Sequence, residues 1–192
     1  MAKLYYRFSS MNAGKSTSLL QTAFNYKERG YKVLIFTSAL DDRYGTGKVT
    51  SRIGIDADAT IIPKDDVSVL NEARASLISN QIAAIFVDEC QFLSEEQVDI
   101  LGEIVDDYGI PVFCYGIRTD FGSNLFSGSK RLFEISDSIE ELRNICQCGN
   151  KAIMNARLVD STEQVLIGGN DVYQSMCRKC YRNFLKKKID KE

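Results

Sequence analysis

The sequence predicts an α/β fold, with a parallel sheet flanked by helices, followed by a small metal-binding unit. Three observations predict it. Apolar runs alternate with helical patterns over about the first 140 residues, a Gly-Lys-Ser triplet follows the first run, and four cysteines gather near the C-terminus. Strands that alternate with helices form parallel sheets with helices on both faces. A chain of 192 residues suits one main domain with a small appendage.

The elements of the sheet domain follow from composition and periodicity. The expected strands are the apolar runs 4–8, 32–38, 82–89 and 110–116, and the expected helices are 15–30, 67–79 and 94–109. Leu19, Leu20, Ala23 and Phe24 form the predicted apolar face of the first helix. Ser94 and Gln97 have the spacing of a capping box at the start of the third. The polar segment 40–54 is expected to be a mobile loop or hairpin.

Composition and charge exclude several classes of protein. The net charge of −2 and the isoelectric point near 5.4 argue against a nucleic-acid binder. No apolar run approaches the ~20 residues that span a bilayer. The start "MAKLYYRF" lacks the features of a signal peptide. We therefore expect a cytoplasmic protein without a membrane or nucleic-acid partner.

The stretch "SSMNAGKS", residues 9–16, predicts a phosphate-binding loop. It lies between an expected strand and an expected helix, where unpaired backbone N–H groups bind anions. Gly14 lets the backbone approach a phosphate, Lys15 reaches the outer phosphates, and Ser16 can ligate magnesium. Ser9 replaces the first glycine of the usual pattern but removes no phosphate donor. The rival "YGTGKVT" has valine where Ser or Thr is needed, and no helix is expected after it.

A second element, "AAIFVDECQF", ends an apolar strand in Asp88 and Glu89. A carboxylate at such a strand tip is where a phosphate-loop enzyme needs its magnesium partner. Two solvated acids at an ordinary strand end are the alternative, but the phosphate loop favours the functional interpretation. The chain has no histidine, so a general base must be a carboxylate, Lys, Tyr or Cys.

Four cysteines in two close pairs predict a structural zinc site. These are Cys146, Cys148, Cys177 and Cys180. Their clustering matches a Cys₄ site, and two disulfides are the alternative, disfavoured in a reducing compartment. Cys90 and Cys114 lie in apolar surroundings and are expected to be small core residues.

The combination of motifs resembles the type II, cellular and phage-type, thymidine kinase family. The motifs, in order, are "MNAGKS", "LDDR", "VDECQF", "YGIRTDF" and "LIGGNDVYQSMCRKCY", and they cover nearly the whole chain. The resemblance implies transfer of the γ-phosphate of ATP, with Mg²⁺, to the 5′-hydroxyl of thymidine or deoxyuridine in nucleotide salvage. It also implies a structural Zn²⁺ and a homo-oligomer, a dimer or tetramer.

The resemblance also implies the site residues. The ATP-binding residues are Ser9, Ser10, Met11, Asn12, Ala13, Gly14, Lys15, Ser16, Asp41, Asp42, Arg43, Asp88, Glu89, Cys90 and Gln91. The nucleoside-binding residues are Phe121, Gln164, Val165, Leu166, Ile167, Gly168 and Tyr173, most of them in a lasso-like loop that the zinc site anchors. Glu89 is the implied catalytic base, and Ser16 with Asp88 the implied magnesium ligands. Asn155 stands where family members often carry threonine near the base.

The expected division is a phosphate-loop RecA-like domain at 1–142 and a zinc-ribbon and lasso domain at 143–192, where the helical periodicity fades. Two other functions share some of these features. One is a phosphate-loop ATPase that acts on nucleic acid through the ribbon, which fits the charge poorly. The other is a non-catalytic adaptor, which would leave Lys15 and Glu89 without a purpose.

Overall fold

The computed structural model describes residues 1–40 and 47–189 of the chain. In order, its elements are β1 (Leu4–Ser9), α1 (Lys15–Glu28), β2 (Lys32–Ser38), β3 (Lys48–Thr50), β4 (Asp56–Asp58), β5 (Thr60–Ile62), α2 (Ser68–Ser76), β6 (Ile82–Val87), the 3₁₀ turn η1 (Cys90–Phe92), α3 (Glu95–Tyr108), β7 (Val112–Ile117), α4 (Ser127–Ile135), β8 (Ser138–Glu141), β9 (Met154–Arg157), β10 (Tyr173–Met176) and α5 (Arg178–Ile189). Among these residues, no helix is both long and apolar enough to cross a bilayer.

The centre of the fold is a six-stranded sheet in the order β5-β2-β6-β7-β1-β8. All of its strand pairs are parallel. The four predicted strands lie in it as β1, β2, β6 and β7. The edge strands β5 and β8 have only three and four residues, too few to show a pattern in the sequence.

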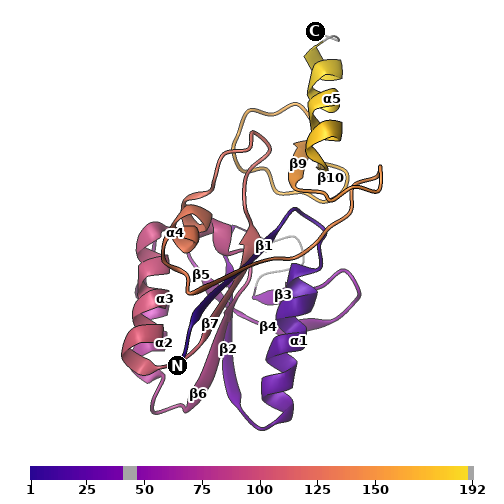
Figure 1. Ribbon diagram of the computed structural model, residues 1–192. Helices are drawn as coiled ribbons and strands as arrows, with labels where there is room; N and C mark the ends of the chain where they lie inside the picture. The colour runs from indigo at the N-terminus through magenta and orange to yellow at the C-terminus, as the bar shows by residue number, and fades with distance from the viewer. Residues whose placement is uncertain (41–46, 190–192) are drawn as a thin grey trace.

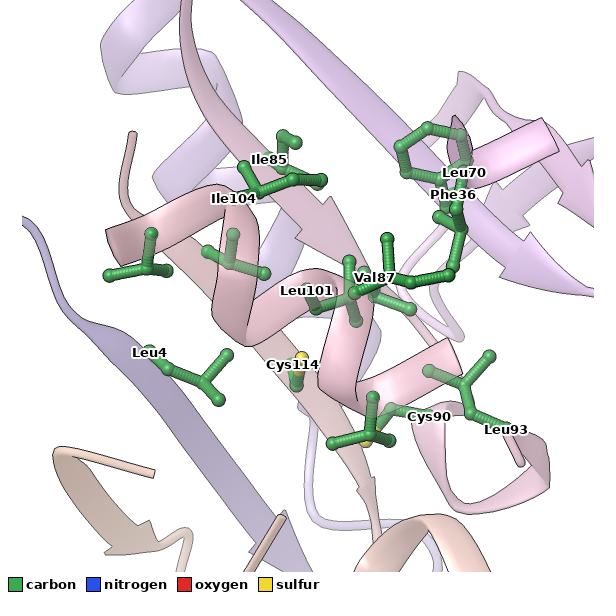
Figure 2. Close-up of a cluster of buried hydrophobic side chains, with 14 of the residues drawn as sticks. Leu4, Phe36, Leu70, Ile85, Val87, Cys90, Leu93, Leu101, Ile104 and Cys114 are labelled. Carbon is green, nitrogen blue, oxygen red and sulfur yellow. The ribbon is translucent and has the colours of Figure 1, made fainter. Parts of the chain in front are cut away.

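Helices cover both faces of this sheet, with α1 on one face and α2, α3 and α4 on the other (Figure 1). Figure 2 shows Leu101 and Ile104 of α3 pointing onto the strands beside Val87, Ile85 and Cys114. Cys90 and Cys114 are fully buried there, as predicted for small core residues. The predicted α/β fold is confirmed.

Local rules explain the start of α3 but not the predicted apolar face of α1. Ser94 accepts a hydrogen bond from the Gln97 backbone N–H, and the Gln97 side chain accepts one from Ser94 N–H, so the capping box forms. In α1, the prediction for Phe24 is wrong, because its side chain is 56% exposed. Each residue turns the helix by about 100°, so Phe24 projects away from the side on which Leu19 and Ala23 pack.

The C-terminal unit, by which we mean residues 143–189 with β9, β10 and α5, lies at the carboxyl end of β1 (Figure 1). It has a small core of its own. Strands β9 and β10 pair antiparallel, in line with the short strands expected there. The sequence did not predict α4 or α5. Half of the residues of helix α5 are charged, and Tyr181 and Phe184 pack on the small core, so the helix has few apolar residues by which to recognise it. The division at residue 142 stays a prediction.

The segment 40–54 was expected to be a loop or hairpin. Strand β3 within it pairs antiparallel with β4, which forms a hairpin beside α1. Residues 41–46 of the segment, including Asp41, Asp42 and Arg43, lie outside the described residues.

Candidate active site

The loop between β1 and α1 has the backbone of a phosphate-binding turn. Gly14 precedes the helix with φ 76°, and Asn12 has φ 67°, both left-handed conformations. A side chain at Gly14 would have open space, so its glycine serves the backbone angle. The first turn of α1 carries no side-chain cap. Helical N–H groups point toward the N-terminus, so those of this first turn face the loop, where they can bind an anion.

Lys15 and Ser16 place their polar groups inside this loop. The buried Lys15 ammonium donates to Ser10 O at 3.2 Å and to Ser9 Oγ at 3.4 Å. Ser16 Oγ donates to Asp88 Oδ2 at 2.7 Å. The two predicted magnesium ligands thus meet, although they come from α1 and from the end of β6.

Asp88 is 5% exposed, and its environment makes its charge costly. Burial, and then the neighbouring Glu89, raise the pKa of Asp88 to about 7, while the hydrogen bond from Ser16 and the charge of Lys15 lower it. A bound cation would favour the ionised form. A hydroxyl and a carboxylate oxygen are also ligand types that Mg²⁺ prefers, so these residues fit that ion.

Glu89 follows β6 in a left-handed conformation with φ 51°. Its carboxylate Oε2 accepts a hydrogen bond of 2.5 Å from Gln91 Nε2. Gln91 in turn accepts one from the Ile117 N–H at 3.1 Å, at the end of β7. The Gln91 side chain therefore connects a strand end of the sheet to the Glu89 carboxylate.

Two glycines make room for the turn η1 that carries Gln91. A Cβ on Gly116 would lie 2.6 Å from Gln91 Oε1, and one on Gly128 would lie 2.4 Å from Cys90 O. Neither glycine could carry a side chain without moving the turn. The Cys90 side chain points into the core, so only its main chain could contact a nucleotide.

One pocket extends from the phosphate loop to the C-terminal unit. Its lining from the sheet domain is Met11–Thr17, Thr50–Ile53, Glu89, Gln91, Phe92, Ile117, Thr119, Asp120, Phe121 and Phe126, and from the C-terminal unit it is Asn155, Gln164–Gly168 and Tyr173. All the predicted nucleoside-binding residues line this pocket together with most of the phosphate loop. Ser9, Ser10, Asp88 and Cys90 lie behind this lining and support it.

The far wall of the pocket is the loop 158–172 between β9 and β10. Gln164 Nε2 donates to Asp120 Oδ2 at 3.1 Å, which attaches this loop to the segment that follows β7. A Cβ on Gly168 would lie 2.3 Å from Val172 Cγ2, so this glycine is required by close packing within the loop. Tyr181 of α5 donates to the Phe121 carbonyl.

The C-terminal unit also contacts the phosphate loop directly at Met11. Asn155 Oδ1 accepts from the Met11 N–H at 2.8 Å, and its Nδ2 donates to Thr119 O at 3.1 Å. Asn144 Nδ2 and Ser175 Oγ donate to Met11 O at 2.6 and 2.5 Å. The main-chain N–H and the main-chain carbonyl of Met11 are therefore both hydrogen-bonded by side chains of the C-terminal unit.

The four clustered cysteines come together at the base of the C-terminal unit. Their sulfur atoms lie within 4.8 Å of one another, and Cys148 and Cys177 are 3.6 Å apart. Sulfur ligands on a tetrahedral Zn²⁺ are ~3.8 Å apart for Zn–S bonds of about 2.3 Å. The main-chain and side-chain N–H groups of Asn150 lower the pKa of the Cys148 thiol to about 6, whereas hydrogen bonds with the neighbouring thiols raise the pKa of Cys180, so the cluster favours one thiolate and a bound cation would favour the others. These residues could hold a zinc ion.

Several residues of the site were not predicted. Thr119 and Asp120 belong to the motif "YGIRTDF", of which Phe121 alone was predicted to contact the nucleoside. Thr50–Ile53 reach the pocket through the β3–β4 hairpin, and no local pattern signals this. Arg157 is 3% exposed and lies beneath the loop 158–172. Its sequence position does not predict this burial, because an arginine in a short strand normally faces solvent.

Comparisons with known proteins agree with this geometry. The family model described as thymidine kinase matches residues 2–181. The chain is 51% identical over 191 residues to a thymidine kinase of Shewanella oneidensis, covering 96% of this chain and 99% of that protein. It is 51% identical to one of Vibrio vulnificus (97% and 100% covered) and 50% identical to one of Haemophilus influenzae (95% and 97% covered). The chain therefore belongs to the thymidine kinase family.

Proposed function

We propose that this protein is a thymidine kinase that transfers the γ-phosphate of ATP to the 5′-hydroxyl of thymidine. One observation carries the proposal: a single pocket joins the phosphate loop and Glu89 to the loop 158–172. Such a pocket can hold a phosphate donor and a small acceptor together. The family and the names of its relatives support the same substrate. We further propose that the protein works in the cytoplasm as a homo-oligomer.

The chemistry of phosphoryl transfer assigns roles to the described residues. The reaction passes through a loose transition state, so the protein contributes positioning and charge. In this assignment Lys15 and the N–H groups of the loop neutralise the phosphates, and Glu89 accepts the proton of the attacking hydroxyl. Gln91 holds the Glu89 carboxylate in place from the end of β7. Magnesium, held by Ser16 and Asp88, would supply further positive charge beside the transferred group.

The loop 158–172 suggests how the base is selected. We infer that main-chain groups of 164–168 form hydrogen bonds with the pyrimidine. Cytosine presents a lone pair where thymine presents its ring N–H. An unpaired buried acceptor costs about 1–3 kcal/mol, so deoxycytidine should react ~10–100-fold less efficiently. Deoxyuridine lacks only a methyl group, so its loss should be about 1 kcal/mol or less.

An assay of thymidine, deoxyuridine, deoxycytidine and deoxyadenosine with ATP and Mg²⁺ tests the proposal. We expect 5′-monophosphates of the first two and little product from the others. Equal efficiency on deoxycytidine and thymidine would contradict base selection by this loop. ADP release that needs added DNA instead of a nucleoside would favour an ATPase acting on nucleic acid.

A further inference from the structure

We propose that Arg157 is a positioning residue that holds the loop 158–172 in the shape that binds the nucleoside. This inference rests on the proposed function, because it takes residues 164–168 as the wall that contacts the base. Arg157 is absent from the described residues that line the pocket. Any effect on the substrate must therefore pass through the residues that Arg157 contacts: the loop, Tyr173 and Phe121.

Arg157 stands at the base of this loop. It is the last residue of β9 and lies opposite Tyr173, the first residue of β10. Next to this pair, the Leu158 N–H donates to Val172 O at 2.8 Å and closes the two ends of the loop. The arginine thus occupies the point where the chain leaves the β9–β10 sheet and returns to it.

The guanidinium group reaches back into the loop and binds its main chain. Nη1 donates to Ser161 O at 3.1 Å and also to Glu163 O. Nη2 donates to Gln164 O at 3.1 Å and to Tyr173 Oη at 2.7 Å. A planar group with five donors can satisfy several acceptors in fixed directions, which a lysine ammonium cannot reproduce.

Tyr173 and Phe121 extend this arrangement to the pocket. Tyr173 Oη accepts from Arg157 and donates to Leu166 O at 2.9 Å. The middle of the pocket wall is therefore also held in position, through Tyr173. The guanidinium carbon lies 3.8 Å from the centre of the Phe121 ring. One face of that ring is therefore covered by a cation, and the ring is fixed relative to the loop.

The hydrogen-bond partners of Arg157 indicate that the buried side chain and the loop depend on each other. Each oxygen described as accepting from it is neutral: three carbonyls and one phenol. Burying a charge is costly unless it is well hydrogen-bonded, so this side chain depends on the loop being folded around it. The loop depends equally on the arginine. Their shared network favours the ordered form of the loop.

Steady-state kinetics of Arg157→Lys test the inference. If the loosened loop spends a tenth of its time in the binding shape, the apparent Kd of the nucleoside rises about tenfold. We expect the KM for thymidine to rise by about that factor, while the KM for ATP changes less than about twofold, since Arg157 does not contact the phosphate loop. Arg74→Lys is the matched control, because Arg74 bonds Glu103 between α2 and α3. It should leave both values unchanged.

Limited proteolysis by a glutamate-specific protease, without nucleoside, provides a readout that is independent of catalysis. Glu163 lies in the loop and is exposed, so the bond after it reports loop opening. We expect faster cleavage there in Arg157→Lys than in the wild type, with thymidine slowing cleavage in both. Unchanged cleavage and an unchanged KM for thymidine would overturn the inference.

Tyr173→Phe covers the case in which Arg157→Lys fails to fold. It keeps the ring but removes the hydroxyl that joins Arg157 to Leu166, so cleavage after Glu163 should again be faster than in the wild type. Wild-type protection in this variant would contradict the network. A wild-type protein that does not phosphorylate thymidine would refute the proposed function instead, and the cleavage rates would still test the hold of Arg157 on the loop.

Discussion

The six-stranded sheet and the C-terminal unit are stabilised by different means. The sheet has continuous apolar cores on both faces, formed by strands and helices with many fully buried aliphatic side chains. The core of the C-terminal unit has six buried members, and two of them are cysteines of the clustered set. A core this small contributes little, so metal binding is the expected source of its stability.

The two parts of the chain also differ in how the polar side chains at the pocket are held in position. In the sheet domain, Ser16, Asp88 and Glu89 are placed by strand and helix ends, which the apolar core fixes. In the C-terminal unit, Asn155 is placed by a hydrogen bond to Met11, which is distant in sequence, and Arg157 by hydrogen bonds to carbonyls of the loop that follows it. The groups around the phosphate loop therefore follow from the frame of the sheet. The wall of the pocket at the loop 158–172 depends instead on hydrogen bonds that involve both parts of the chain.

The largest expected effect would test the sheet side of this comparison. Glu89→Gln should lower kcat by ~10²–10⁴-fold, because the amide keeps the shape but cannot accept a proton. ATP binding, measured by calorimetry, should persist. Glu72→Gln, at an exposed site on α2, is the control and should leave kcat unchanged. Wild-type turnover in Glu89→Gln would reassign the base.

Loss of the metal would test the C-terminal side. Cys177→Ser should remove most of the one zinc per chain expected from metal analysis, because a structural site needs all four thiolates. The KM for thymidine should rise by about 100-fold or more as the preformed loop is lost, and the KM for ATP by a smaller factor as the contacts to Met11 loosen. Cys114→Ala, in the core of the sheet domain, should keep the zinc. A zinc content near zero in the wild type would contradict this prediction.

The third prediction is that a cavity in the core of the sheet domain lowers stability without releasing zinc from the C-terminal unit. Leu101→Ala should lower the free energy of unfolding by about 2–5 kcal/mol, since it leaves a cavity beneath α3. Zinc content at low temperature should stay at the wild-type value. Leu185→Ala, at a 39% exposed position on α5, is the control and should change stability little. Loss of zinc in Leu101→Ala would mean that the two units do not differ in this way.

The smallest effect should come from the contact between the units. Ser175→Ala removes one hydrogen bond to Met11 O, while Asn144 still binds the same carbonyl. A bond of this kind contributes about 1 kcal/mol, so the KM for ATP should rise about fivefold at most. The thymidine KM should change less. Ser79→Ala on the surface is the control, and an unaltered ATP KM in Ser175→Ala would show that the phosphate loop keeps its shape without the hydrogen bond from Ser175.

Much of the sheet domain could be predicted from the sequence, because its signals are local. Alternating apolar runs gave four strands of the sheet, and Ser94 with Gln97 gave the start of α3. The meeting of Ser16 with Asp88 was also predictable, since parallel strands bring their carboxyl ends to one edge of the sheet. The four cysteines were recognisable by spacing, because two close pairs can bring four sulfurs together, as the structure does.

Only the tertiary structure decided the remainder. The edge strands β5 and β8 are too short to show a pattern, and half of the residues of α5 are charged, so these elements depend on packing against others. Arg157 has no local pattern at all: its burial arises from carbonyls that fold back over it and from Phe121, which another element supplies. The sequence by itself determined the frame, the phosphate loop and the acidic pair through residues close along the chain. The shape of the pocket was decided by contacts between distant segments, because those contacts exist only once both parts of the chain have folded together.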